Sequence, residues 1–469
     1  MPDSAANTPP VAPVFRNVLD SIGNTPMVEV TRLDRGPCGL FLKLESQNPG
    51  GSIKDRIGKS MIEAAERDGS LKPGGTLIEA TAGNTGLGLA LVAAQKGYRL
   101  IIVLPDKMAQ EKIFHLKALG AEVHLTRSDV GKGHPDYYQD VAERLNREIP
   151  NSFYVNQFAN PANPLAHEAT TGPEIWAQME QDVDAVICGV GSGGTISGLG
   201  RYFRKVAPQL EMVLADPEGS VLANYVKTGK LAEEVGSWLV EGIGEDFMPP
   251  NANELEGVKK AYTISDAEAM HTARELLRKE GVLAGSSSGT LIAAALRYCR
   301  EQSEPKRVVT FVCDSGNKYL TKMFNDYWMI DQGFIERDSH GDLRDLISRR
   351  HEEHATVTVA PDDTLLTAYG RMKLYDISQL PVLDDGGEVV GIVDENDILL
   401  SVFKDEEHFQ DPVRSAMTAK LETIQADRPL PALLPILDQG HIAIVMEDEH
   451  FLGLITRIDL LNHLRRQMK

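Results

Sequence analysis

The feature that most constrains the fold is an alternation of short β-branched runs with amphipathic stretches through the first three hundred or so residues. Gly-rich turns follow several of the runs, which is typical of parallel strands joined by crossover helices. The pattern therefore predicts an α/β structure of mostly parallel, helix-covered sheets, and its length favours two lobes with a ligand cleft between them. The predicted strands are 76–80, 99–104, 122–125, 184–190, 211–215 and 308–313, and the predicted helices are 57–67, 87–96, 137–148, 266–280 and 290–301.

The pattern changes after Asp331, where a polar and charged segment favours an exposed linker. Two similar units of about sixty residues follow, and they align at Gly391-Ile-Val and Gly453-Leu-Ile. Neither unit is long enough to bury both faces of its own sheet. We therefore expect the two repeats to pack as a pair.

Composition narrows the class of protein. The chain of 469 residues has 68 acidic and 48 basic residues, a net charge of −20, which argues against nucleic acid or an anionic membrane as the main partner. It shows neither a secretory signal nor an apolar run long enough to span a membrane. The four scattered cysteines form no Cys-x-x-Cys pair, which argues against a disulfide framework or a zinc site. We expect a cytoplasmic protein.

The segment NPGGSIKDRIGKSMIEAA at 48–65 carries the strongest local signal. Ser52 and Asp55 have the spacing of a capping box, which predicts a helix that begins at Ser52 with Lys54 in its first turn. A lysine there opposes the helix dipole, and in an arbitrary helix it would simply be tolerated. The preceding Gly50 and Gly51 let a ligand approach the backbone closely. A lysine that is easily neutralised at such a place suits a Schiff base.

Two further turns lead into apolar helices. At 79–97 a strand runs into Thr81-Ala82-Gly83-Asn84-Thr85-Gly86, whose free N–H groups could hold a carboxylate or phosphate, or form an ordinary turn. At 281–296 another strand–turn–helix pattern carries Ser286, Ser287 and Ser288 in its turn. Such serines, taken alone, are more often solvated or capping than functional.

The segment DAVICGVGSGGTISGLG contains a G-x-G-x-x-G pattern after a strand, with Asp216 about twenty residues on. That is the dinucleotide fingerprint, and it allows a dehydrogenase. The loop Gly191-Ser192-Gly193-Gly194-Thr195 would hold any single phosphate equally well, through backbone N–H groups and the helix dipole. The motif predicts phosphate binding and leaves open whether the ligand is a dinucleotide or a small phosphorylated cofactor.

Together the segments SIGNTPMVEV, GGSIKDR, AGNTG, GSGGT and AGSSSG resemble, in this order, the fold-type II enzymes of pyridoxal phosphate. Among these, NPLAHEATTGPEI, DPEGS and VEGIGEDFMP resemble the cystathionine β-synthases, and the C-terminal repeats resemble paired CBS domains, or a Bateman module. The resemblance implies a catalytic domain at 1–335, a linker at 336–350 and CBS domains at 351–408 and 409–469. It also implies a homodimer or a higher homo-oligomer.

The resemblance also implies site residues. Lys54 would form the Schiff base, Asn84 would bind the ring oxygen of the cofactor, and Ser287 would face its pyridine nitrogen. Ala82 replaces a common serine, and Phe158 and Glu245 replace tyrosines, which leaves the thiol acceptor open. The residues before Ser21 contain neither Cys nor His, so we expect no haem. The implied phosphate loop is Gly191, Ser192, Gly193, Gly194 and Thr195, and the implied substrate loop is Thr81, Ala82, Asn84 and Thr85 with Gln157.

The implied reaction is the β-replacement of L-serine by L-homocysteine to give L-cystathionine and water, and release of hydrogen sulfide from cysteine is a related possibility. The main alternative is a cysteine synthase that uses O-acetylserine and sulfide, or a serine/threonine dehydratase. A dehydrogenase would explain neither Lys54 nor Ser287. A nucleotide-sensing protein with an inert catalytic lobe is a further alternative, against which an intact Lys54, Asn84 and phosphate loop argue.

The repeats suggest a regulatory ligand. In the second repeat, GLITRID places Thr456 and Asp459 where Bateman modules hold an adenosine ribose. In the first repeat, Asp394 stands at the hydroxyl position, where its charge would repel a ligand phosphate. We expect at most one adenosyl site, in the second repeat. Alternatively, Asp459 only caps the final helix, and the pair serves only for dimerisation.

Overall fold

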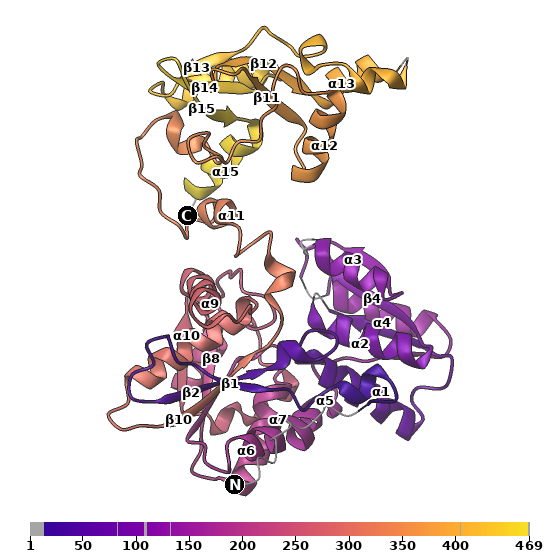
Figure 1. Ribbon diagram of the computed structural model, residues 1–469. Helices are drawn as coiled ribbons and strands as arrows, with labels where there is room; N and C mark the ends of the chain where they lie inside the picture. Colours follow the sequence, from indigo (N-terminus) through magenta and orange to yellow (C-terminus); the bar gives the residue numbers. More distant parts are fainter. Residues whose placement is uncertain (1–13, 82, 107–109, 132, 404, 468–469) are drawn as a thin grey trace, which may run out of the picture. The chain divides into compact units, whose positions relative to one another are not determined.

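The computed structural model describes residues 14–81, 83–106, 110–131, 133–403 and 405–467. The chain divides into two compact units, Met1–Met323 and Phe324–Lys469 (Figure 1). Unit one contains two sheets and their covering helices, and unit two contains the two repeats.

The two sheets of unit one confirm the expected α/β class. One has six strands in the order β1-β2-β10-β7-β8-β9, and only β1 is antiparallel to its neighbour. The other has four parallel strands in the order β5-β4-β3-β6. All six predicted strands are present, and no end differs from its prediction by more than two residues. The strands are β1 (Met27–Glu29), β2 (Gly39–Leu44), β3 (Thr76–Ala80), β4 (Arg99–Pro105), β5 (Glu122–Thr126), β6 (Ser152–Tyr154), β7 (Ala185–Cys188), β8 (Glu211–Pro217), β9 (Lys260–Ile264) and β10 (Arg307–Val312).

Helices cover both faces of the four-stranded sheet, which explains its continuous apolar strands. Leu77 and Ile102 pack into a core with residues of α1 and α2 on one face. Ile78 and Val103 pack against α4 on the other. The predicted strand before α10 is absent, because Ala284 forms only a single bridge with Ser315. The helices of unit one are α1 (Lys54–Asp68), α2 (Asn84–Lys96), α3 (Gln110–Ala118), α4 (Tyr138–Glu148), α5 (Ala162–Ala166), α6 (Gly172–Gln178), α7 (Gly194–Val206), α8 (Leu222–Thr228), α9 (Asp266–Glu280) and α10 (Ser286–Arg300), with a π-helix η3 (His167–Thr171) and 3-10 turns η1 (Val18–Ser21), η2 (Glu45–Gln47), η4 (Pro250–Gly257) and η5 (Gly316–Tyr319).

Unit two contains the two repeats, each with its own core. A further apolar cluster of Leu383, Ile444 and Phe451 joins their sheets, which confirms that the repeats pack as a pair. The first repeat contains α12 (Leu365–Tyr375), β11 (Gln379–Leu383), β12 (Val389–Asp394) and α13 (Glu395–Val402). The second contains β13 (Thr423–Gln425), α14 (Leu434–Asp438), β14 (Ala443–Glu447), β15 (His450–Ile455) and α15 (Arg457–Gln467). The remaining elements are α11 (Asp326–Asp331) and the 3-10 turns η6 (Leu343–Leu346), η7 (Glu406–Gln410), η8 (Val413–Ser415) and η9 (Leu430–Leu433).

The segment that was expected to be an exposed linker is partly buried. Leu343, Leu346 and Ile347 pack into the core of the second repeat, beside Val445 and Ile455. These three residues stand at positions i, i+3 and i+4, which is the spacing of an apolar helical face. Charged residues outnumber them in the segment, and for this reason its sequence indicates an exposed linker. The expectation of an exposed linker was therefore wrong for these three residues.

Within the described ranges, no helix combines the length and the apolar character needed to cross a membrane.

Candidate active site

Lys54 stands at the first residue of α1, beside the carboxyl end of β10. The backbone N–H of Ile53 donates to the carbonyl of Cys313 at 2.8 Å, which fixes the start of the helix against the large sheet. The predicted capping box is wrong, and the helix begins two residues later than expected. Ser52 pairs with Asp314 instead, and the Asp55 carboxylate accepts from the N–H of Gly50 at 2.5 Å.

The Lys54 side chain lines a cavity together with Cys188, Cys313 and the loop at 191–195. Burial lowers the pKa of Lys54, and the nearby Cys313 and Asp314 oppose this shift. A lowered pKa increases the fraction of neutral amine, which is the form that attacks a carbonyl carbon or accepts a proton. The structure thus brings the predicted lysine and the predicted phosphate loop to one cavity.

The loop from Gly191 to Thr195 forms the N-terminal end of α7, a helix of 13 residues. Among the described residues, no partner is seen for its backbone N–H groups. Gly193 has a φ of +83°, and a Cβ there would lie 2.6 Å from the backbone nitrogen of Ala252. Free N–H groups at a helix N-terminus bind phosphate. This cradle therefore fits the phosphate of pyridoxal phosphate.

Two residues that the sequence analysis did not single out hold the phosphate loop. The Asn163 Nδ2 donates to Ser192 Oγ at 2.9 Å and to the carbonyl of Gln157 at 2.8 Å. The His167 Nε2 lies 3.3 Å from Thr195 Oγ1. Both lie in a segment quoted only for its resemblance, and nothing in its local pattern indicates these long-range contacts.

The expected substrate loop lies at the carboxyl end of β3, where α2 begins. Thr81, Thr85 and Gln157 are buried, and Thr85 Oγ1 donates to Gln157 Oε1 at 2.6 Å. Behind them, the Glu79 carboxylate accepts from the N–H of Gln157 at 3.4 Å. Burial raises the pKa of Glu79 to about 8. Ala82, also expected in this loop, lies outside the described residues.

The three serines at the start of α10 have different surroundings. Ser286 Oγ accepts from the N–H of Glu241 at 3.0 Å, and Ser288 Oγ accepts from the N–H of Cys313 at 2.9 Å. Ser287, between them, lies against the Cys313 thiol, whose pKa burial raises to about 12. The side chains of Ser286 and Ser288 therefore bind backbone N–H groups. Of the three serines, only Ser287 is expected to face the cofactor.

Asn84 is held from both sides. Its Oδ1 accepts from Lys318 Nζ at 2.8 Å, and its Nδ2 donates to Asp314 Oδ2 at 2.8 Å. Asn84 is predicted from the sequence as a site residue, whereas its partners Lys318 and Asp314 are not.

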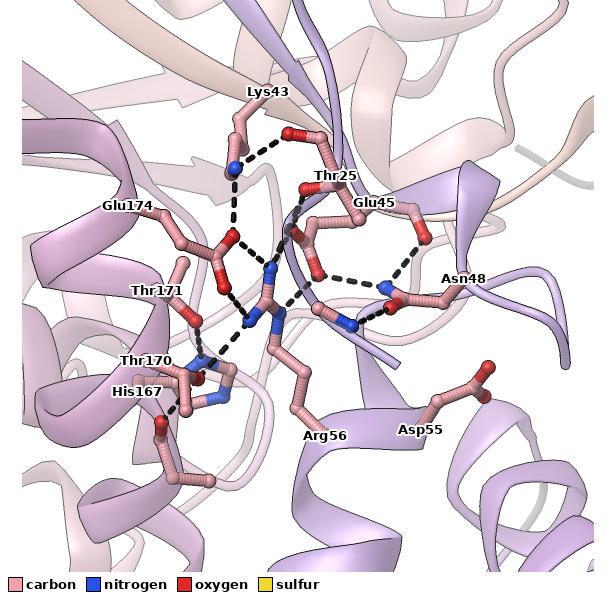
Figure 2. Close-up of polar contacts among 12 residues, drawn as sticks. Thr25, Lys43, Glu45, Asn48, Asp55, Arg56, His167, Thr170, Thr171 and Glu174 are labelled. Atoms are coloured by element: carbon pink, nitrogen blue, oxygen red, sulfur yellow. Dashed lines mark hydrogen bonds and ion pairs between the residues drawn. The ribbon is translucent and has the colours of Figure 1, made fainter. Parts of the chain in front are cut away.

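A buried ion network surrounds Arg56 (Figure 2). Arg56 donates to Glu45 at 2.7 and 2.8 Å and to Glu174 at 2.7 Å, and Lys43 donates to Glu174 at 2.8 Å. Two cations thus meet two carboxylates from β2, η2, α1 and α6, with little exposure of any of them. Because Arg56 is two residues after Lys54, the network anchors the first turn of α1.

The dinucleotide interpretation finds no support at Asp216. Its buried carboxylate accepts from the N–H of Ala223 at 2.7 Å, at the start of α8, so it is not directed to a ribose. No group of three or more His, Cys, Asp or Glu side chains suited to a metal occurs in the described part of the chain.

In the second repeat, Thr456 and Asp459 lie together at the start of α15. Thr456 Oγ1 donates to Asp459 Oδ2 at 2.6 Å, and Ser348 Oγ donates to Asp459 Oδ1 at 2.9 Å. In the first repeat, Asp394 and Asp397 form a capping box at the start of α13. Asp459 thus accepts from the N–H of Thr456 at 2.8 Å in the same way as Asp397 accepts from the N–H of Asp394 at 3.1 Å.

Comparison with known proteins adds the family. Residues 18–314 match the family described as "Pyridoxal-phosphate dependent enzyme", and residues 344–404 and 413–466 match the CBS domain. Cystathionine beta-synthase of Dictyostelium discoideum is 37% identical over 97% of this chain and 93% of its own length.

Two solved structures cover 66% of the chain at 36% identity, each with a TM-score of 0.61. One is an O-acetylserine dependent cystathionine beta-synthase from Helicobacter pylori, of which 99% is covered. The other is a hydrogen sulfide-producing enzyme from Fusobacterium nucleatum, of which 100% is covered. The family match covers more than half of the chain, and the cavity that Lys54 and the phosphate loop share agrees with it. The chain therefore belongs to the cystathionine β-synthase family of pyridoxal-phosphate-dependent enzymes, with a C-terminal pair of CBS domains.

Proposed function

We propose that the enzyme replaces the β-hydroxyl of L-serine with the thiol of L-homocysteine, giving L-cystathionine and water. The observation that carries the proposal is the shared cavity of Lys54 and the phosphate loop. The similarity to the Dictyostelium protein, which extends through both CBS domains, supports the serine reaction. The O-acetylserine dependence of the Helicobacter protein, itself a cystathionine beta-synthase, supports O-acetylserine as the alternative donor. With sulfide as the acceptor, this donor would make the enzyme a cysteine synthase.

Lys54 has two roles in this proposal. Pyridoxal phosphate, when bound, supplies the electron sink that lets a substrate lose its α-proton and then its β-substituent. The Lys54 amine would hold the cofactor, and its neutral form would take the α-proton and later return it. The burial that lowers the pKa of Lys54 favours the neutral amine that both roles require.

The substrate carboxylate would bind at the N-terminal end of α2. Thr85 donates to Gln157 Oε1, and the Gln157 amide also hydrogen-bonds the Glu79 carboxylate, which leaves one amide hydrogen for a further acceptor. Thr81 and the free N–H groups of the first turn of α2 add further donors. With its carboxylate bound there, an amino acid would present its α-carbon toward Lys54.

A substrate panel tests the reaction. Serine or O-acetylserine is supplied with homocysteine or sulfide, and the products are identified by mass. We expect cystathionine from serine and homocysteine as the fastest reaction. Cysteine from O-acetylserine and sulfide as the faster product would overturn the proposal in favour of the alternative.

Replacement of Lys54 by Ala tests the chemistry. We expect this variant to remain folded, to lose the visible absorbance of the lysine-bound cofactor and to lose activity. Borohydride reduction of the unaltered enzyme should place the cofactor on Lys54. Retention of a tenth of the original turnover by the variant would contradict the assignment.

For the CBS pair we propose at most one adenosyl site, at Thr456 and Asp459. The paired carboxylates Asp394 and Asp397 support its absence from the first repeat, because they would repel a phosphate. Calorimetry of the full-length protein with S-adenosylmethionine, AMP and ATP tests this, with Asp459→Asn as the comparison. Heat that Asp459→Asn abolishes supports the site, and no heat from any of the three compounds would leave Asp459 as a helix cap only.

A further inference from the structure

Lys318 links two parts of the candidate site that are far apart in sequence. It lies in η5, after β10, and its side chain is half-buried. The Lys318 Nζ donates to Asn84 Oδ1 at 2.8 Å and to the carbonyl of Gly51 at 3.2 Å. One ammonium therefore contacts both the first residue of α2 and the loop that leads to Lys54.

The two partners of Asn84 determine how its amide is oriented. Lysine can only donate a hydrogen bond and an ionised aspartate can only accept one. With Lys318 at Oδ1 and Asp314 at Nδ2, rotating the amide by 180° would place two donors together and two acceptors together. The observed orientation uses one Nδ2 hydrogen on Asp314 and leaves the second for another acceptor.

We propose that Lys318 is a positioning residue, which holds Asn84 so that its remaining Nδ2 hydrogen donates to the ring oxygen of pyridoxal phosphate. The inference rests on the cofactor site proposed above. Lys318 also brings a positive charge one side chain away from that oxygen. A nearby cation favours the deprotonated form of the cofactor chromophore.

Other charged groups face Lys318 from three elements. Asp314 and Asp55 oppose the loss of its charge, whereas burial and the cation of Lys112 lower its pKa. His115, on α3, is itself affected by Lys318, since burial and this ammonium lower the pKa of His115. Tyr319 donates to the same Asp314 oxygen that binds Asn84, at 2.8 Å. Because Lys318 is coupled to all these groups, its effect on the site is best measured through the affinity and the pH titration of the bound cofactor.

The test compares Lys318→Met, Lys318→Gln and Lys318→Arg, with Lys96→Met as a matched control. Lys96 is at the far end of the helix that Asn84 begins, and its ion pair is with Glu66. Cofactor affinity is measured by fluorescence on the apoprotein, and the bound chromophore is titrated by absorbance against pH.

We expect Lys318→Met to bind pyridoxal phosphate about tenfold more weakly, the factor for one charge-assisted hydrogen bond. Its chromophore should titrate at higher pH, because the deprotonated form has lost a stabilising cation. Lys318→Gln should show the same titration shift with a smaller loss of affinity, since its amide can still donate. Lys318→Arg and Lys96→Met should behave like the unaltered enzyme.

An unchanged titration midpoint in both Lys318→Met and Lys318→Gln would overturn the inference, including when thermal stability falls. If Lys318→Met does not fold, Lys318→Gln decides. An unaltered enzyme that shows no cofactor absorbance would instead overturn the proposed function itself.

Discussion

The Nε2 atom of His167 lies 3.3 Å from Oγ1 of Thr195, and its Nδ1 lies 3.0 Å from Oγ1 of Thr171. Burial lowers the pKa of His167 well below its ordinary value, so the ring is neutral and has one donor and one acceptor. A phosphate only accepts, so Thr195 would donate to a phosphate bound in the proposed cradle. His167 then donates through Nε2 to Thr195 and accepts from Thr171.

This relationship predicts coupling between His167 and Thr195. We expect His167→Leu and Thr195→Ala each to weaken cofactor binding by three- to tenfold, because Thr195→Ala removes the hydrogen bond to phosphate and His167→Leu removes the donor that orients the Thr195 hydroxyl for it. The double variant should bind the cofactor with the same affinity as whichever single variant binds it less tightly. Fluorescence titration gives the three affinities, and additive losses would show that His167 does not act through Thr195.

Gly193→Ala should impair the phosphate cradle. A Cβ there would lie 2.6 Å from the backbone of Ala252, at a φ that side chains rarely adopt, so the loop must shift. We expect at least a tenfold loss of cofactor affinity. Gly200→Ala, in the same helix, is the control, because its Cβ would meet only the Glu254 side chain at 3.6 Å. Equal affinity in the two variants would count against the cradle.

Ser287→Asp should alter the choice of reaction. A neutral hydroxyl does not hold the pyridine nitrogen protonated, whereas a carboxylate would. We expect the variant to retain the cofactor but to lose most β-replacement and to gain transamination or racemisation. Product analysis and the cofactor spectrum measure both effects. Unchanged β-replacement would refute this account of reaction choice.

Arg56→Met should destabilise the fold strongly. It leaves Glu45 and Glu174 buried with a missing cation, and breaking a buried pair in this way costs about 3–5 kcal/mol of unfolding free energy. Arg99→Met removes an exposed pair with Glu122 and should cost about 0–1 kcal/mol. Urea unfolding measures both. Similar losses would mean that the network contributes no more than a surface pair.

Glu79→Gln should change how stability depends on pH. With its pKa raised to about 8 from an ordinary 4.5, the folded protein keeps a proton that the unfolded chain loses between these values. The stability of the unaltered protein therefore falls as pH rises through this window. The glutamine variant lacks this loss and should gain stability relative to it toward pH 8. Urea unfolding from pH 5 to 8 checks this, with exposed Glu143→Gln as the control; parallel profiles would refute the assignment.

The sequence predicted those parts of the site whose chemistry is local. Lys54 follows a pair of glycines, and the loop at 191–195 joins a strand to a helix, so both motifs are visible within a few residues. The strands were predicted because apolar, β-branched runs form a sheet that is buried on both faces.

The partners of these residues could not be predicted in the same way. Asn163, His167 and Lys318 contact the site from segments between 28 and 234 positions away, and each is an ordinary polar residue in its own segment. Asp55 was misread for a related reason. Its predicted capping partner, Ser52, is bridged to a residue that lies beyond β10.

The burial of Leu343, Leu346 and Ile347 affects the order in which unit two can fold during synthesis. These residues leave the ribosome before the first repeat, yet they belong to the core of the second. They must stay uncovered while the whole first repeat emerges and folds around α12 and β11. Because Leu460 of the last helix belongs to the same core, this core can close only after that helix has been made. The second repeat is therefore completed when the segment before the first repeat meets the C-terminal helix. This contact closes the first repeat into a loop.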